Sequence, residues 1–208
     1  MPLALSDADP RAPLLGLLDR YVSVASEAEA TVTLFREFVC AHADCFERSC
    51  APGHLTGSAW LVDGSGRRVL LTHHRKLGRW LQLGGHADGD GDLARVARRE
   101  AEEESGLRDL IVEPAIFDLD RHLIPARGNE PAHWHYDVRF VVRATGSEEF
   151  TISEESHALA WREITGVAVD SSVDESVRRM AHKWLKGTRA GHHSRESGAF
   201  NSGAGHPT

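Results

Sequence analysis

Residues 97–106 read ARREAEEESG, and the glycine-rich stretch LGGHADGDGD precedes them at residues 83–92. Placed on a helix at about 100° per residue, the apolar residues of this segment form one stripe. Three carboxylates fall within the same arc, whereas an ordinary charged surface helix would keep them on the far side. These three inward carboxylates are Glu100, Glu103 and Glu104.

These carboxylates need a partner. Burying even one unpaired carboxylate is costly, and three at close range repel one another. Protonation or a divalent cation relieves this repulsion, and several oxygen ligands close together suit Mg²⁺ or Mn²⁺. Arg99 lies between the inward and outward faces and flanks the carboxylates. The pattern therefore predicts a divalent cation at this helix.

The segments around the helix alternate between strand and helix patterns. Gly64-Ser65-Gly66 separates two β-type runs, and Gly106 is a natural left-handed cap for the helix. Strands on both sides of one central helix favour an α/β sandwich with a mixed sheet covered on both faces. The expected helices are 13–24, 26–42, 92–105 and 171–186, and the expected strands are 58–63, 67–74, 79–83, 107–124, 133–145 and 158–164.

The composition indicates one ordinary domain with additions at both ends. With 208 residues, of which 41% are hydrophobic, the chain can bury a sizeable core. The last residues are poor in apolar side chains and rich in Gly, Ser and His, which is typical of disorder. The expected regions are a flexible N-terminus at 1–12, a helical extension at 13–54, a main domain at 55–186 and a disordered tail at 187–208.

Charge and hydropathy exclude several function classes. The net charge of −7 argues against binding a nucleic acid polymer through bulk electrostatics. No apolar run approaches the roughly 18–20 residues that span a bilayer, and the N-terminus does not resemble a secretory signal. We therefore expect a cytoplasmic protein without a membrane partner.

The three cysteines, Cys40, Cys45 and Cys50, fit a reducing compartment better than a disulfide framework. Together with His42 and His54 they could form a zinc cluster, but their spacing matches no common finger. Buried or incidental thiols are the favoured interpretation.

At this point the sequence resembles a known family. Gly85, followed after thirteen residues by REAEEESGL at 99–107, resembles the Nudix box of the Nudix hydrolases, and Trp80 matches the usual lead-in. The pattern is a glycine, five residues, a glutamate, seven residues, and then Arg-Glu, an apolar residue, any residue, Glu-Glu, any residue, Gly and an apolar residue. Its second half is highly specific, and the resemblance covers roughly residues 55–186.

The resemblance implies a Nudix-type α/β/α sandwich and a reaction. Such enzymes cleave a nucleoside diphosphate linked to another moiety, and they require Mg²⁺ or Mn²⁺. By the same resemblance, Glu103 and Glu104 would bind the metal, and Glu100 would be a ligand or would help to activate water. Arg99 would orient a glutamate, and the carbonyl of Gly85 would be a further ligand.

One position departs from the pattern. The first glutamate of the box is replaced by Gly91, which has no side chain. Asp88, Asp90 or Asp92 could substitute for it, or its supporting role could be absent. We expect the departure to affect an outer metal site and the catalytic rate more than the type of reaction.

The segment 133–140, HWHYDVRF, alternates polar and apolar residues, as a half-buried strand does. Its polar face is either wet surface or one wall of a substrate cleft, in which Arg139 or a histidine would meet phosphate. The candidate substrate-binding residues are His86, His133, His135, Asp137, Arg139 and Glu155, the last from an acidic loop.

The leading interpretation is a Nudix pyrophosphohydrolase that acts on a small diphosphate-containing molecule. One alternative is an isomerase of isoprenyl diphosphates, but its cysteine would have to lie in the main domain. Another is a nucleotide-binding regulatory module that has lost catalysis. The helical extension and exposed strand edges also leave room for a homodimer.

Overall fold

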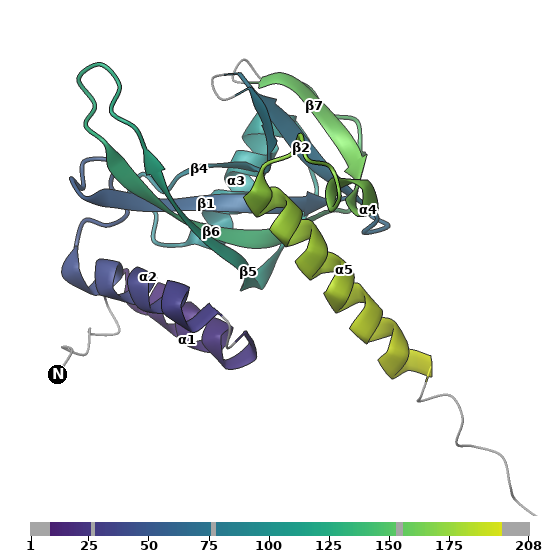
Figure 1. Cartoon of the computed structure of the whole chain (residues 1–208), viewed down its shortest axis with the longest axis horizontal. Coiled ribbons are helices and arrows are strands. Elements are labelled where there is room, and N and C mark those ends of the chain that lie inside the picture. Colours follow the sequence, from purple (N-terminus) through teal and green to yellow (C-terminus); the bar gives the residue numbers. More distant parts are fainter. Residues whose placement is uncertain (1–8, 26–27, 76–77, 153–155, 197–208) are drawn as a thin grey trace, which may run out of the picture.

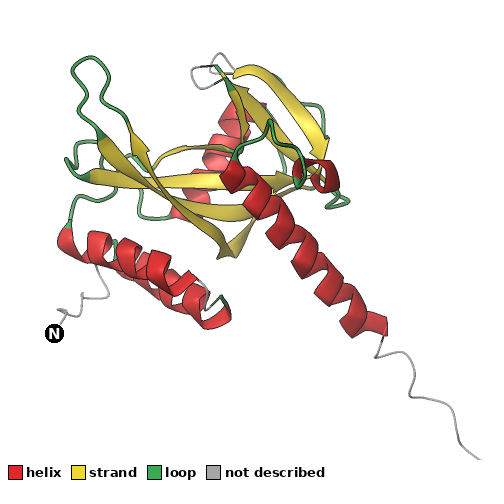
Figure 2. Cartoon of the chain, viewed as in Figure 1, coloured by secondary structure: helices red, strands yellow, loops and turns green. Residues whose placement is uncertain are grey.

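The computed structural model describes residues 9–25, 28–75, 78–152 and 156–196. Two helices, four strands, one helix, three strands and two helices follow one another along the described chain (Figure 2), and the separate strand at 83–86 and the short helix at 164–167 were not predicted from the sequence. The helices are α1 (Ala12–Val24), α2 (Glu29–Ala41), α3 (Leu93–Ser105), α4 (Ile164–Val167) and α5 (Glu175–Glu196). The strands are β1 (Gly53–Val62), β2 (Arg68–His74), β3 (Arg79–Leu81), β4 (Leu83–His86), β5 (Leu110–Ile124), β6 (His133–Ala144) and β7 (Ser156–Glu163).

Helices cover the mixed sheet on both faces, which confirms the expected α/β/α sandwich. On one face, α3 and the helices α1 and α2 pack against the sheet through a common apolar core. On the other face, α4 and α5 pack against the large side chains of Trp60, Leu71 and Val141. Figure 1 shows α5 crossing one side of the sheet while α3 lies behind it.

The central strand β1 determines where the sheet opens. Along one edge it pairs in parallel with β6 over its whole length, from Gly53↔Trp134 to Val62↔Arg143. Along the other edge, β4 pairs antiparallel with residues 56–59, whereas β2 pairs only at Val62. The sheet therefore divides at this edge, and the start of β4 lies where the two parts separate.

The N-terminal helices are built into the core of the main domain. Phe35 of α2 is fully buried and meets the ring of Tyr136 on β6 edge to face, with centroids 5.3 Å apart. Phe38 stacks on the same ring at 3.9 Å. Cys45 and Cys50 are buried free thiols, and Cys40 is an exposed one. The extension at 13–54 therefore shares its packing with the sheet.

The last helix is longer than the sequence predicts. α5 runs to Glu196, ten residues beyond the expected end at 186, so part of the expected tail is helical. A glycine within a helix costs only about 1 kcal/mol, so Gly187 does not have to end it. Residues 197–208 of the expected tail lie outside the described ranges. Among the helices of the described ranges, none has the length and hydropathy to span a bilayer.

Candidate active site

The helix α3 begins and ends where the sequence predicts. The side chain of Asp92 accepts a hydrogen bond from the backbone nitrogen of Arg95 at 3.1 Å, which caps the first turn. Gly106 ends the helix in a left-handed conformation with φ 71°. The buried stripe consists of Leu93, Val96, Ala97, Ala101 and Ser105, so the predicted inner face is confirmed.

Glu100 lies directly over β4. A Cβ atom at position 85 would overlap the carboxylate of Glu100, so only glycine lets the helix approach the strand this closely. The side chain of Glu100 is 17% exposed. Burial raises the pKa of this carboxyl group, and the nearby charge of Arg99 opposes the rise. The carboxylate of Glu100 thus lies against the backbone of Gly85.

Arg99 fixes the orientation of this carboxylate. Its Nη2 atom donates to Oε1 of Glu100 at 2.8 Å and to the backbone oxygen of His86 at 2.9 Å. Its Nε atom lies 4.0 Å from Oε1 of Glu103. The hydrogen bond to Glu100 raises the pKa of Arg99. Arg99 therefore ties α3 to β4 and leaves the second oxygen of Glu100 without this constraint.

The other two carboxylates differ from each other in exposure. Oε1 of Glu104 accepts a hydrogen bond from the backbone nitrogen of Gly84 at 2.8 Å. Glu103 is 65% exposed, which is more than the helical projection suggests. The reason is that Glu103 falls about 80° from the centre of the buried stripe, at its margin. Glu100 and Glu104 therefore lie against β4, and Glu103 lies at the rim.

These groups fit a hard divalent cation. Carboxylates from two successive turns of one helix meet a glycine backbone, and all the donors are oxygen atoms. Mg²⁺ and Mn²⁺ prefer oxygen donors of this kind. The residues that could hold such an ion are Gly85, Glu100, Glu103 and Glu104.

The space around position 91 is filled by the N-terminal part of the chain. A Cβ atom on Gly91 would lie 2.9 Å from the backbone oxygen of Pro10 and 3.7 Å from the ring of Phe46. The segment before α1 and the connector after α2 therefore occupy the space that a longer side chain would need. Both segments belong to the N-terminal part of the chain, which the family motif does not include.

The neighbouring aspartates have other partners. Asp88 pairs with Arg48 at 2.8 Å, and Asp90 pairs with Arg95 at 2.6 Å. Asp92 caps α3 as described above. Each of the three possible substitutes for the missing glutamate therefore already has a partner of its own.

Most of the polar face of β6 is buried, so it is not the wet surface that was one of its two interpretations. Asp137 accepts hydrogen bonds from Thr56 at 2.9 Å, from Ser58 at 2.7 Å and from Arg139 at 2.7 Å. Gln82 donates to the same carboxylate at 3.3 Å. Asp137 and Arg139 are each 2% exposed. In this conformation Arg139 pairs with protein carboxylates. Its guanidinium therefore has no exposed N–H group that could donate to a phosphate.

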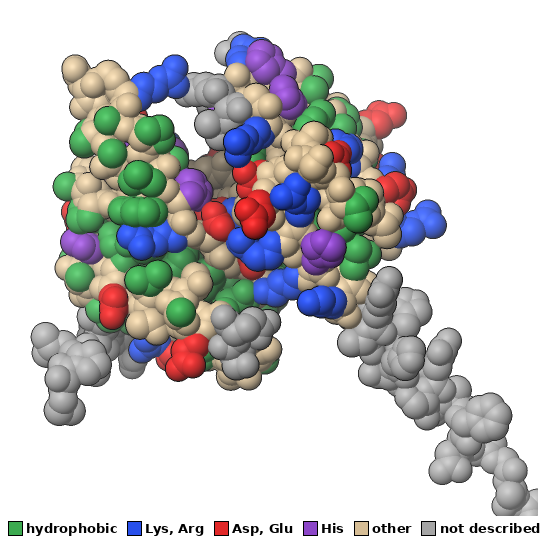
Figure 3. Space-filling model, in the orientation of Figure 1, with side chains coloured by type: hydrophobic (Ala, Val, Ile, Leu, Met, Phe, Trp, Pro, Cys, Tyr) green, Lys and Arg blue, Asp and Glu red, His purple; other side chains and the backbone are tan. Residues whose placement is uncertain are grey.

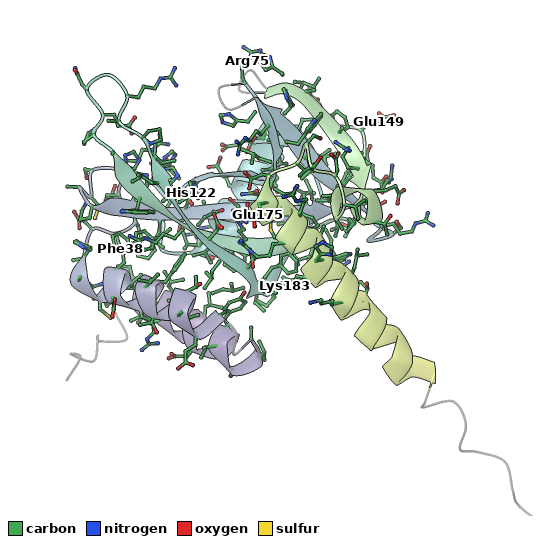
Figure 4. The ribbon with its side chains drawn as sticks, viewed as in Figure 1. Phe38, Arg75, His122, Glu149, Glu175 and Lys183 are labelled. Carbon is green, nitrogen blue, oxygen red and sulfur yellow. The ribbon has the colours of Figure 1, made fainter. Side chains whose placement is uncertain are left out.

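The cause is a charge network that joins β6 to β5 and α5. Arg139 lies 3.5 Å from Asp118 and 3.3 Å from Asp120, and Arg179 of α5 contacts the same two carboxylates at 2.7 and 2.9 Å. Lys183, labelled in Figure 4, lies 3.7 Å from Asp118. Figure 3 shows acidic and basic side chains gathered where the sheet meets α5.

The network shifts the pKa of Asp120. Burial alone would raise the pKa of Asp120, but the hydrogen bond from His122 and the charge of Arg139 outweigh it and lower the pKa. Asp118, Asp120 and Arg179 were not among the residues predicted for the site. The alternation of Asp118 and Asp120 along a predicted strand was the available signal for the first two.

The three predicted histidines do come together. His86 ends β4, and His133 and His135 begin β6. They gather around His54 of β1, which the sequence analysis considered only as part of a cysteine cluster. Glu155 lies outside the described residues, so the expectation for its loop remains a prediction.

Two grooves lie away from the carboxylates of α3. One, of about 1160 Å³, is bordered by α1, the start of α3 and β5. The other, of about 1040 Å³, runs between α2, β5 and α5 and includes Arg179 and Lys183. Neither is lined by Glu100, Glu103 or Glu104. The candidate active site is therefore identified by the chemistry of its carboxylates and not by the size of a groove.

Comparison with known proteins agrees with the fold. An Ap4A hydrolase of C. elegans superposes with a TM-score of 0.51 at 17% identity, covering 66% of this chain and 98% of that one. A MutT protein of Methanosarcina mazei gives 0.52 at 16% identity, covering 67% and 98%. The E. coli dihydroneopterin triphosphate pyrophosphohydrolase gives 0.52 at 15% identity, covering 64% and 95%. At these identities the likeness establishes the fold alone.

The sequence comparison identifies the family. No curated protein matches the chain. Residues 54–183, more than half of the chain, match the NUDIX domain. With the mixed sheet, the α3 carboxylates and the glycine approach of β4 in place, this chain belongs to the Nudix family.

Proposed function

We propose that this protein is a metal-dependent hydrolase that cleaves a diphosphate bond in a nucleoside diphosphate derivative or a similar small molecule. Water would attack phosphorus directly, so no nucleophilic side chain is required. The observation that supports this most is the packing of Glu100 against Gly85, with Arg99 fixing one oxygen of the carboxylate. Family membership supports the same reaction class.

The chain would hold Mg²⁺ or Mn²⁺ through the carboxylates of Glu100, Glu103 and Glu104 and the carbonyl of Gly85. When bound, such an ion neutralises phosphate oxygens and lowers the pKa of water. The hydrogen bond between Glu104 and Gly84 fixes the angle at which α3 presents its carboxylates. Because the three carboxylate ligands lie on one rigid helix, the diphosphate would be held in a constant orientation.

Glu100 is the best-placed proton acceptor. One of its oxygens accepts from Arg99, and the other is not bound by that arginine. Burial raises the pKa of Glu100, which makes its carboxylate a stronger base than an exposed one. Arg99 would keep the carboxylate oriented while a proton moves from water to the second oxygen.

The substrate is proposed only as a class. The structural relatives bear names that refer to different phosphate compounds, such as Ap4A and dihydroneopterin triphosphate. The net charge of −7 favours a small substrate over a nucleic acid polymer. Among the candidate substrate contacts, His86 directly follows Gly85 in β4, and its side chain lies on the face of the strand opposite α3.

A second candidate function rests on position 91. Pro10 fills the space where the family pattern has a glutamate, so the chain could bind nucleotides without turning them over. The presence of all three α3 carboxylates of the pattern argues against such a regulatory module. The isomerase alternative is weaker, because Cys45 and Cys50 are buried in the N-terminal core.

Turnover of a panel of diphosphate-linked compounds in Mg²⁺ or Mn²⁺ distinguishes these functions. We expect metal-dependent product from the unmodified chain and a loss of about 100-fold or more in Glu104→Gln, which keeps an acceptor for Gly84. The matched control is Glu102→Gln on the solvated face of α3, where Glu102 lies 3.6 Å from Arg98. Binding without turnover by the unmodified chain would support the regulatory module instead, and unchanged turnover in Glu104→Gln would contradict the proposed site.

A further inference from the structure

Four histidines from three strands meet on the face of the sheet opposite α3. The ring of His54 lies 4.9 Å from that of His133, 4.7 Å from that of His135 and 5.0 Å from that of His86. His86 and His135 are 5.1 Å apart. The pairing registers explain the grouping, since His54 aligns with His135 across β1 and β6. Protonated rings at these distances would repel one another, so a cluster this close indicates a shared function for the neutral rings.

The ring nitrogens converge on one point. One nitrogen from each of His54, His133 and His135 lies within 4.8 Å of the others. The Nε2 atoms of His133 and His135 are 3.3 Å apart. Two nitrogens bound to one tetrahedral zinc ion at 2.0–2.1 Å would be separated by about 3.3–3.4 Å. This pair already has the spacing of two ligands of one ion.

A second-sphere contact sets the tautomer of His133. Its Nδ1 atom lies 2.9 Å from the backbone oxygen of Pro131, so Nδ1 carries the hydrogen and donates it. The lone pair of Nε2 then points into the cluster. Histidines that bind metal commonly donate their other N–H to a carbonyl or carboxylate in this way.

His54 supplies an independent observation. It is 2% exposed, and neither of its ring nitrogens has a hydrogen-bond partner among the described residues. Buried polar groups almost always have a partner, and leaving one without costs stability. The ring of His54 can therefore coordinate a metal ion, and three other imidazoles surround it.

The protonation state of the cluster suits a cation. Burial, together with the neighbouring His86 and His133, lowers the pKa of His54 to about 4. Burial and the same neighbours also lower the pKa of His135. The lowered pKa values favour the neutral form of His54 and His135, and neutral imidazole is the form that binds metal.

We propose that His54, His133 and His135 bind one divalent transition-metal ion, of the zinc type. Imidazole nitrogens select Zn²⁺ and its relatives, whereas the oxygen atoms of Glu100, Glu103 and Glu104 select Mg²⁺ or Mn²⁺. The two sites lie on opposite faces of β4, because Gly85 faces α3 and His86, the next residue, faces the histidines. This is a second metal site with its own ligand chemistry, and it does not depend on the proposed hydrolysis.

The route to the site is also on this face. His135 is partly exposed, and Oε1 of Glu130, whose side chain is 63% exposed, lies 3.8 Å from Nε2 of His133. An ion can therefore enter from the β5–β6 loop, where Glu130 offers a carboxylate at the rim. Three histidine ligands match the number of protein ligands in catalytic rather than closed structural zinc sites.

The test measures metal content and does not use turnover. The full chain, freed of metal with a chelator, is dialysed against Zn²⁺ in the presence of excess Mg²⁺, and bound zinc is counted per chain. We expect one zinc ion per chain and a rise of several degrees in Tm on zinc addition. Substitution by Co²⁺ should give the visible absorption of a nitrogen-ligated ion.

His135→Gln and His54→Gln should each weaken zinc binding by more than about 100-fold. Loss of a residue that only hydrogen-bonds to a ligand weakens binding by at most about 100-fold, so a larger loss identifies a ligand. His73→Gln, in which the lost ring packs on Trp80, is the matched control and should keep full binding. Thermal unfolding in chelator shows that each variant folds. If the buried His54→Gln does not fold, the partly exposed His135→Gln carries the test.

The proposal is overturned if the unmodified chain takes up no zinc, if Mg²⁺ displaces it, or if both histidine variants bind zinc as well as His73→Gln does. Glu103→Gln separates this proposal from the hydrolase. Zinc uptake should be unchanged in that variant, and loss of zinc there would place the ion at the carboxylates instead. Failure of turnover with zinc retained would contradict the hydrolase alone.

Discussion

At the scale of single residues, position 91 shows how distant packing can remove a side chain from a family pattern. A Cβ atom there would come within 2.9 Å of the Pro10 carbonyl, and the Pro10 side chain is also close. The family motif places a glutamate at this position, but in this chain the space belongs to the N-terminal segment. The departure is therefore accommodated by local structure and does not itself show that the active site has degenerated.

Gly91→Glu tests this steric account. We expect a loss of about 1–3 kcal/mol in the free energy of unfolding, because the new side chain must displace the Pro10 segment. Restoring the family residue should not increase turnover. The charge-matched control is Gly166→Glu, since a Cβ at position 166 meets nothing within 4 Å. Urea denaturation of both variants measures the difference, and equal stabilities would refute the clash.

At the scale of elements, the turn between β1 and β2 depends on one buried carboxylate. Asp63 is 2% exposed and accepts hydrogen bonds from Ser65, from the backbone of Arg67 and from Arg68, the last at 2.8 Å. Burial opposes ionisation, but these bonds outweigh it and lower the pKa of Asp63. The turn thus replaces water around the carboxylate with backbone and guanidinium donors.

Asp63→Asn should lower the free energy of unfolding at pH 7 by about 2 kcal/mol, because a charged acceptor of several hydrogen bonds is lost. The pKa of Asp63 is lower in the folded state than in the unfolded state. Its contribution is therefore present above the unfolded pKa of about 3.9 and is lost as the pH falls below that value. Urea denaturation at pH 7 and at pH 3 should show the gap between variant and unmodified chain shrinking at the lower pH. A gap that grows on acidification would contradict the sign.

The elements also show what sequence reasoning could and could not reach. The face of α3, its end at Gly106 and the strand runs were predictable, because each depends on residues within a few positions of one another. The burial of Asp137 and Arg139 was not, because Arg179, which covers the network from α5, is separated from Asp118 by 61 positions. The alternating pattern of β6 gives two faces and does not tell which later helix covers the polar one.

At the scale of the whole molecule, the N-terminal helices and the sheet form one hydrophobic core. Phe35 and Phe38 of α2 meet Tyr136 of β6, and apolar residues of α1, α3 and β5 belong to the same cluster. The sequence predicted a helical extension but could not show that it shares its core with the domain. The homodimer expected from that extension stays a prediction.

Phe35→Ala should therefore destabilise the entire protein by about 3–5 kcal/mol, because it removes a fully buried ring from the joint core. We expect one cooperative transition at lower denaturant, seen equally by tryptophan fluorescence of the sheet and by helical circular dichroism. The control is Leu34→Ala on the same helix, where the side chain is 42% exposed and the loss should be under about 1 kcal/mol. Two separate transitions would mean that the extension unfolds on its own.

The shared core has a consequence for how the boundary of this protein is drawn. The family match begins at residue 54, yet the apolar surface under that match extends to Leu14 and Leu18 of α1. A gene fragment cut at the family boundary would leave Tyr136 and its neighbours facing water, and such a patch favours aggregation. The boundary of the folded unit therefore lies before α1, because α1 and α2 cover apolar side chains of the sheet.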